Sequence, residues 1–165
     1  MSHDVWTTKP AKTFFKAVKR VNLDTSSIKK ELKSLHANRI SRTLKGSKIT
    51  LKRIREAAAQ EQSYRSRCVE LMLESDSIYT NLNSLMESVS MQILILYGDQ
   101  LPVTTKTDRK EYIRLGFINR VPILEKLNEI KELTYYIVED IDKAAWALKL
   151  LASTFSSATK AEFSI

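Results

Sequence analysis

The pattern of apolar and polar positions along the chain predicts long helices. The longest uninterrupted stretch runs from Ser47 to Tyr97 without a glycine or proline, and its apolar residues recur at near-heptad spacing. This spacing predicts one long helix or two helices end to end, with residues 74–77 as the place for a break. An unbroken helix of this length would be longer than the diameter of a compact domain of this size. We therefore expect it to form a hairpin, to break, or to pack along neighbouring subunits.

A second heptad stripe occupies the last helix that the sequence predicts, from Ile123 to Phe155. Its apolar residues alternate in steps of four and three residues, which favours lengthwise packing against another long helix. The stretch 47–97 is the candidate for that partner helix. We assign core or oligomer packing to seven residues of the stripe: Ile123, Leu127, Ile130, Ile137, Ile141, Leu148 and Leu151.

Two shorter helices are predicted before the long one. Thr8 and Pro10 indicate the start of a basic amphipathic helix that reaches about Val21. A cluster of capping residues at 24–27 precedes a second helix whose apolar stripe extends to Leu44. The first helix can dock on its own core, on a partner or on a neighbouring subunit. A basic amphipathic helix can also lie on a membrane surface.

A loop at residues 99–107 separates the long helix from the last part of the chain. Asp108 and Glu111 have the spacing of a capping box, so a brief helix is expected to begin there. Gly116 and Pro122 are expected to interrupt it. The Ser, Thr and Ala-rich residues 156–165 are expected to form a frayed tail.

These elements predict an all-α fold, a long helical hairpin or bundle with short flanking helices. The composition agrees, since 43% of the 165 residues are hydrophobic, 28% are charged, and only three are glycine and three proline. We expect a single domain over residues 1–165, with helical segments at 1–22, 24–97 and 108–155 and a tail at 156–165. The absence of a long apolar run predicts a soluble cytoplasmic protein without a membrane-spanning segment, in the host cytoplasm if the protein is viral.

The net charge of +8 is concentrated near the N-terminus. Residues 1–56 carry fifteen Lys and Arg against four Asp and Glu, whereas residues 57–165 carry twelve against fifteen. Such asymmetry is typical of proteins that bind nucleic acid or another anionic surface. A merely solvated helix face with surplus lysine is the alternative.

One basic run marks the candidate DNA-binding segment. Six cations with no acid among them occupy the fourteen residues from Arg42 to Arg55, and two arginines continue the same helix. Cations on one helix stripe can follow a sugar-phosphate backbone and release its condensed counterions. The candidate contacts are Arg42, Lys45, Lys48, Lys52, Arg53, Arg55, Arg65 and Arg67.

The same segment offers no sign of base-specific contacts. Tyr64 could stack on an unpaired base or fill the core at its heptad position. No arrangement resembles a recognition helix, so we expect backbone contacts without sequence preference. The outer face of the last helix is acidic and would repel phosphate. It suits basic regions of a neighbouring subunit or a partner, or is simply solvated.

The sequence shows no motif for catalysis or for a cofactor. Three scattered glycines supply no phosphate-binding loop, and the two histidines and one cysteine form neither a triad nor a zinc set. Cys68 is expected to fill the core, and His36 lies beside an apolar stripe without further ligands. We predict a protein that is not an enzyme and has no catalytic residues, metal or cofactor.

The order of these features resembles that of the phage recombination mediators of the UvsY type, which load a recombinase onto single-stranded DNA covered by single-strand-binding protein. A Lys and Arg-rich segment leads into the long helix, and a loop and a closing helix follow. The likeness lies in Val21-x-Leu23-Asp24-Thr25 with Ile28, in Leu96-Tyr97-Gly98, in Asp108-Arg109-x-Glu111, and in Asp142, Trp146, Leu148 and Lys149.

The resemblance implies a small all-helical subunit that forms a ring-like homo-oligomer. It also implies binding of single-stranded DNA and contacts with the recombinase and the single-strand-binding protein, in recombination and repair. The leading hypothesis is therefore a non-enzymatic recombination mediator. The alternatives are a structural or scaffolding protein of a virion or nucleoid whose basic end contacts nucleic acid, and a small regulatory protein that binds a partner through its first helix.

Overall fold

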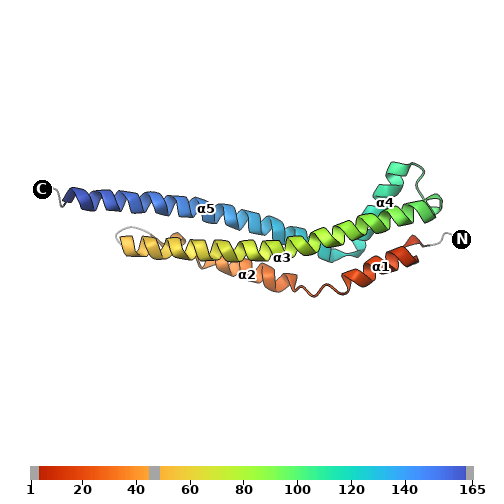
Figure 1. The fold of residues 1–165 in the computed structure, drawn as a ribbon, viewed down its shortest axis with the longest axis horizontal. Coiled ribbons are helices and arrows are strands. Elements are labelled where there is room, and N and C mark those ends of the chain that lie inside the picture. Colours follow the sequence, from red (N-terminus) through yellow and green to blue (C-terminus); the bar gives the residue numbers. More distant parts are fainter. Residues whose placement is uncertain (1–3, 45–48, 163–165) are drawn as a thin grey trace. The chain divides into compact units, whose positions relative to one another are not determined.

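The computed structural model describes residues 4–44 and 49–162, with side chains up to residue 157. Regular structure in these ranges is helical throughout, so the all-α prediction is confirmed (Figure 1). The α-helices are α1 (Lys9–Val18), α2 (Thr25–Ala37), α3 (Leu51–Tyr97), α4 (Lys106–Arg120) and α5 (Pro122–Glu162). Short 3-10 helices lie at η1 (Val5–Thr7), η2 (Ile40–Thr43) and η4 (Gly98–Gln100).

The chain divides into two compact units. Unit 1 comprises residues 1–25 and 74–129, and unit 2 comprises residues 26–73 and 130–165. The helices α3 and α5 each contribute one part to each unit. The surplus of positive charge belongs to unit 2, which has sixteen Lys and Arg against nine Asp and Glu, whereas unit 1 has eleven against ten.

The stretch that the sequence left as one helix or two is a single helix of 47 residues, α3. No break occurs at residues 74–77, because neither glycine nor proline interrupts the backbone hydrogen bonds there. Ser47, the first residue of that stretch, lies outside the described residues. Thr50 caps the start of α3, since its side-chain oxygen accepts the backbone N–H of Arg53 at 3.2 Å.

Unit 1 has an aromatic core. Phe14 of α1 and Phe117 of α4 are fully buried, with ring centroids 4.7 Å apart in an edge-to-face arrangement. Trp6 packs edge-to-face on Phe117 with centroids 5.2 Å apart. Gly116 makes this packing possible, because a Cβ atom at that position would lie 2.1 Å from the indole of Trp6.

The helix α4 corrects two expectations. It begins at Lys106 rather than Asp108, because Thr105 is the N-cap and accepts the backbone N–H of Asp108 at 3.1 Å. Glu111 pairs with Arg114 instead of closing a capping box with Asp108. Gly116 does not interrupt the helix, since it provides space for a neighbouring ring.

Unit 2 packs the first part of α3 against α5. Ile54 and Ala57 of α3 form a buried cluster with Leu148 of α5. Two heptad positions of these helices hold buried polar side chains, Glu61 and Thr134, both fully inaccessible to solvent. Thr134 is satisfied locally, because its hydroxyl donates to the carbonyl of Ile130 at 2.7 Å.

Two helix ends in unit 2 differ from the prediction. The second helix ends at Ala37 instead of reaching Leu44, and the chain becomes extended at Arg39 before η2. This change of direction places the Arg39 side chain in the interior, where it is 2% exposed. At the other end, α5 continues beyond Phe155 to Glu162, so the expected frayed tail is helical over residues 156–162.

Candidate nucleic-acid interface

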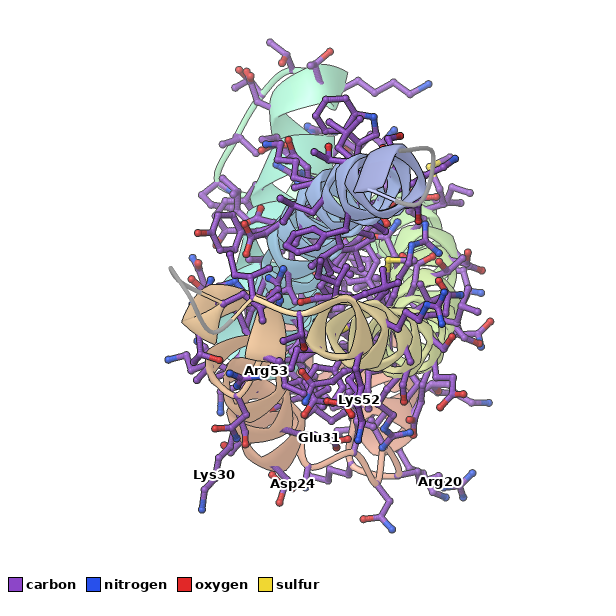
Figure 2. The ribbon with its side chains drawn as sticks, turned by 90° about the vertical axis from the view of Figure 1, so that its left-hand side faces the viewer. Arg20, Asp24, Lys30, Glu31, Lys52 and Arg53 are labelled. Atoms are coloured by element: carbon purple, nitrogen blue, oxygen red, sulfur yellow. The ribbon has the colours of Figure 1, made fainter. Side chains whose placement is uncertain are left out.

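The first turns of α3 carry three of the predicted contacts: Lys52, Arg53 and Arg55. Lys52 and Arg55 are exposed and Arg53 is partly buried. Within the ranges that the structure describes, none of the three forms an ion pair with a carboxylate. Figure 2 labels Lys52 and Arg53 on this end of α3. We refer to these three residues as the α3 basic surface.

The position of these cations strengthens their attraction for anions. The N-terminus of a helix carries a partial positive charge from its aligned peptide dipoles. Cations at this end therefore add to a field that is already positive, at some cost to helix stability. A phosphate group near the start of α3 would be attracted both by these side chains and by the helix dipole, and it would offset the cost to helix stability.

Arg42 is bound to groups of its own unit. Its Nη2 atom lies 3.1 Å from Oδ2 of Asp140 and 2.7 Å from Nε2 of His36. Nε2 of His36 lies in turn 2.9 Å from the same carboxylate oxygen. Burial by itself would raise the pKa of Asp140, but hydrogen bonds from His36, Arg42 and Arg39 outweigh it and lower the pKa to about 2.

Arg65 and Arg67 also have carboxylate partners. Arg65 Nε donates to Asp142 Oδ1 of α5 at 2.7 Å, and this bond raises the pKa of Arg65. Arg67 Nε donates to Glu31 of α2 at 2.7 Å, and a second bond reaches Glu70 at 3.1 Å. These ion pairs are solvent-exposed and contribute little to stability, but each carboxylate already offsets the charge of its arginine, which leaves less of that charge for a phosphate.

The eight predicted contacts thus fall into three groups. Lys52, Arg53 and Arg55 are without carboxylate partners in the described part of the chain, and Arg42, Arg65 and Arg67 have them. Lys45 and Lys48 lie outside the described residues. The geometry therefore narrows the candidate site to the α3 basic surface.

Sequence reasoning missed the buried ion pair of this unit. Arg39 Nε lies 2.8 Å from Oε2 of Glu61, with side-chain exposures of 1% and 0%. Arg39 also donates two hydrogen bonds to Asp140, one to its carboxylate and one to its backbone carbonyl at 3.1 Å. The hydroxyl of Ser41 donates to the carboxylate of Glu61. The available signal was the acidic Glu61 at an apolar heptad position, which requires a buried cation nearby.

Tyr64 occupies a position between core and surface. Its side chain is partly buried, and its hydroxyl accepts a hydrogen bond from Nε2 of Gln60 at 2.9 Å. This contact holds the ring along α3. Tyr64 therefore supplies no freely exposed platform for base stacking.

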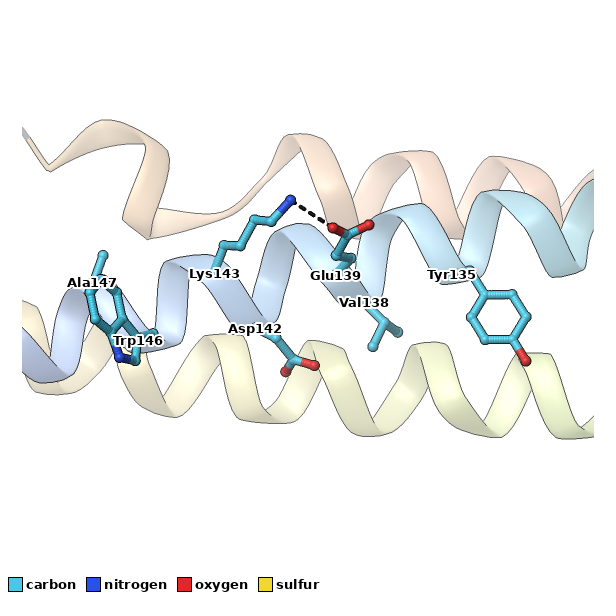
Figure 3. A pocket seen from close by; sticks show the side chains of 7 residues that line it. All are labelled: Tyr135, Val138, Glu139, Asp142, Lys143, Trp146 and Ala147. Carbon is cyan, nitrogen blue, oxygen red and sulfur yellow. Dashed lines mark ion pairs between the residues drawn. The ribbon is translucent and has the colours of Figure 1, made fainter.

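The outer face of α5 is more apolar than the sequence suggested. Tyr135, Trp146 and Leu150 lie on one side of the helix and are 58%, 66% and 47% exposed. Acidic Glu139 and Asp142 lie among them, and Glu139 pairs with Lys143 at 2.7 Å (Figure 3). We refer to Tyr135, Val138, Asp142, Trp146 and Leu150 as the α5 outer face.

The seven stripe residues of α5 are mostly inside the chain. Leu127, Ile130, Ile137, Ile141 and Leu148 are buried, and Ile123 is partly buried against the unit 1 core. Leu151, at 36% exposed, is accessible. Most of the stripe is therefore covered by other parts of the same chain.

The remaining chemistry of the described residues is limited. They contain no group of three or more His, Cys, Asp and Glu side chains that could hold a metal ion. Cys68 is fully buried, and burial raises the pKa of its thiol to about 11. None of the described helices is long and apolar enough to span a bilayer. Comparisons with protein-family models, curated proteins and solved structures find no match to this chain.

Proposed function

We propose that the protein is a non-enzymatic nucleic-acid-binding protein that holds a single strand at the α3 basic surface. We further propose that it acts as a recombination mediator, which promotes loading of a recombinase onto DNA covered by single-strand-binding protein. A homo-oligomer would repeat a weak site several times and so convert modest affinity into tight binding.

The observation that carries this proposal is the unpaired charge at the start of α3. Lys52, Arg53 and Arg55 have no carboxylate partner among the residues described, and they belong to the unit with the charge surplus. Cations that are not neutralised by their own chain are available to neutralise phosphates and release counterions. The contacts are to the backbone, so binding is independent of sequence.

The binding part of the proposal is tested with a fluorescent oligonucleotide. Anisotropy titrations at two salt concentrations should show binding at low salt that weakens steeply as salt rises. A labelled duplex of equal length should bind more weakly than the single strand. Absence of binding at low salt would remove the proposal, and a preference for duplex would remove the mediator role.

The mediator part requires a separate assay. The protein should accelerate assembly of a recombinase on an oligonucleotide that is first saturated with single-strand-binding protein. The matched control is the same assay on bare oligonucleotide, where the acceleration should be small. Equal acceleration on both templates would indicate general strand binding without a mediator role.

The α5 outer face supports a second candidate function, that of a structural assembly protein. Exposed Trp and Tyr on one helix face are typical of contact surfaces between proteins. On and beside this face Glu139 and Asp142, which pair within the chain with Lys143 and Arg65, precede Lys143 and Lys149. A second copy in antiparallel orientation would therefore place acids opposite lysines. Sedimentation of the Trp146→Gln variant tests this candidate, which predicts a smaller assembly than that of the unchanged protein.

A further inference from the structure

The helix α1 of unit 1 presents a second basic surface. Its apolar residues face the interior, where Ala11 and Phe14 are fully buried and Pro10 is buried too. The exposed cations lie on the opposite side, the first four at intervals of three or four residues and the fifth directly after the fourth. They are Lys9, Lys12, Lys16, Lys19 and Arg20.

These five cations form one continuous stripe. At 100° per residue they lie within an arc of about 100°, and the first four are each about one turn apart, with Arg20 directly after Lys19. Helix-type hydrogen bonds continue past the end of α1, from Lys19 N–H to Phe15 and from Arg20 N–H to Ala17, at 3.1 and 3.0 Å. The last two cations therefore keep the register of the helix. The Arg20 side chain extends away from the ribbon (Figure 2).

No carboxylate neutralises this stripe within the described residues. Residues 9–22 contain no Asp or Glu, and no ion pair reaches any of the five cations from elsewhere in the described chain. The stripe thus differs from Arg42, Arg65 and Arg67, which all have acidic partners. Five neighbouring positive charges without counter-charge require a polyanion or mobile counterions.

The chemistry of the surface selects among polyanions. A membrane-surface helix must insert its apolar side, but the apolar side of α1 is committed to the unit 1 core. A protein partner would usually contact exposed aromatic or aliphatic groups, and interface centres are poor in lysine. Lysine and arginine without apolar neighbours are instead the side chains that contact phosphate backbones.

We infer that Lys9, Lys12, Lys16, Lys19 and Arg20 form a second nucleic-acid-binding surface, which contacts the phosphate backbone of a strand. This inference goes beyond the proposed function, because the surface belongs to unit 1 and contains none of the residues of the α3 basic surface. It binds without sequence preference, as expected of contacts to phosphates alone.

The test compares oligonucleotide binding by three triple variants. The α1 variant carries Lys12→Gln, Lys16→Gln and Lys19→Gln. A matched control in the same unit carries Lys106→Gln, Lys110→Gln and Lys126→Gln, which removes equal charge from exposed lysines of α4 and α5. The third variant carries Lys52→Gln, Arg53→Gln and Arg55→Gln. Affinity for a single-stranded oligonucleotide is measured across salt concentrations for each, with helicity checked by circular dichroism.

The α1 variant should lose about tenfold or more in affinity at low salt, and its log–log salt slope should become shallower by about 2, since each phosphate contact on a single strand contributes about 0.7. The control should change both quantities much less. An α1 variant that matches the control would overturn the inference. A loss confined to the α1 variant, with none in the third variant, would support this inference and contradict the proposed function.

Lysine footprinting on the unchanged protein gives a second measurement that does not depend on folding of a variant. Acetylation of Lys12, Lys16 and Lys19 should slow several-fold when the oligonucleotide is bound, whereas acetylation of Lys106 should not. Equal rates with and without oligonucleotide would contradict the inference. Protection of these lysines by anionic vesicles, with none by the oligonucleotide, would assign the surface to membranes and also overturn it.

Discussion

The cation stripe of α1 and the basic run from Arg42 to Arg67 carry similar charge but differ in whether carboxylates lie next to their cations. On α1 every exposed cation lacks a carboxylate partner in the described chain. Between Arg42 and Arg67, three arginines (Arg42, Arg65 and Arg67) have carboxylate partners, whereas Lys52, Arg53 and Arg55 have none among the described residues. Asp140, Asp142 and Glu31 come from other helices, and Glu70, the second partner of Arg67, comes from α3 itself. A run of positive residues therefore indicates where charge is placed, and distant carboxylates determine how much of it is available.

The interiors of the two units also differ, one relying on aromatic packing and the other containing a buried ion pair. Unit 1 is held by close contacts between aromatic rings, around the space that Gly116 leaves for Trp6. Unit 2 contains the buried pair of Arg39 and Glu61 between its helices. Geometric fit should therefore dominate the stability of unit 1, and charge balance that of unit 2.

The largest expected effect comes from breaking the buried pair. Arg39→Met leaves Glu61 in the interior without a counter-charge and with only the Ser41 hydroxyl as a hydrogen-bond partner, which should destabilise unit 2 by about 3–5 kcal/mol. The matched control is Arg67→Met, which breaks an exposed pair and should cost less than about 1 kcal/mol. Urea unfolding followed by circular dichroism measures both. Equal losses would show that the Arg39 pair is not buried as described.

The second prediction concerns the thiol in unit 2. Burial raises the pKa of Cys68 from 9.0 to about 11, so at pH 8 its thiolate fraction is about 100-fold below that of a free thiol. The reaction of the native protein with a disulfide reagent should therefore be much slower than that of a free thiol, both because little thiolate is present and because the buried sulfur is inaccessible, and urea should restore it. Arg39→Met should accelerate the reaction because it destabilises unit 2 and so exposes the thiol more often, whereas Gly116→Ala, which acts in unit 1, should not. Rapid reaction of the native, unchanged protein would contradict the burial of Cys68.

The third prediction addresses the fit in unit 1. Gly116→Ala forces a methyl group into the indole of Trp6 and should destabilise the protein by about 1–3 kcal/mol. At Gly98 the nearest atom to an added Cβ is 3.6 Å away, so Gly98→Ala is the matched control and should change stability little. Adding Trp6→Leu to Gly116→Ala should recover part of the loss. Failure of this rescue would mean that contact with the indole is not the cause.

The two long helices could be predicted from the sequence, but several helix ends could not. Heptad spacing identified α3 and α5 because a long apolar stripe is a property of the chain itself. Helix ends were less accessible, since α2 stops where Arg39 turns inward to Glu61 and Asp140, and Asp140 lies 101 residues away. The start of α4 was also difficult to predict, because Thr105 and Asp108 are both capping residues and Thr105 is the one that caps the helix.

The candidate site was predictable to a similar extent. Composition located the basic segments, including the side chains of α1, but it did not distinguish Lys52 from Arg65. That distinction depends on Asp142, 77 residues from Arg65, which the packing of α3 against α5 brings within 2.7 Å. The sequence predicted an acidic outer face on the last helix but not the exposed Tyr135 and Trp146, because their exposure depends on which side of the helix the core occupies.

The smallest expected effect on stability is that of lowering the pH. The pKa of Asp140 is lowered to about 2, below the ordinary value of 3.8, so its ion pairs stabilise the folded state above about pH 4. This contribution should be lost as the pH falls from about 4 to about 2. Asp140→Asn should flatten the pH dependence of the midpoint of urea unfolding in that range. An unchanged profile would show that the Asp140 contacts do not stabilise the folded state.

The central claim is that cations without carboxylate partners carry the binding of nucleic acid. It is tested most directly by the salt dependence of oligonucleotide affinity for two variants of equal charge. One replaces Lys52, Arg53 and Arg55 by Gln, and the other replaces Arg42, Arg65 and Arg67 by Gln. We expect the first variant to lose more affinity and to flatten the log–log salt slope by about 2, and the second to change the slope by less than half as much. Equal losses in the two variants, or a larger loss in the second, would contradict the claim.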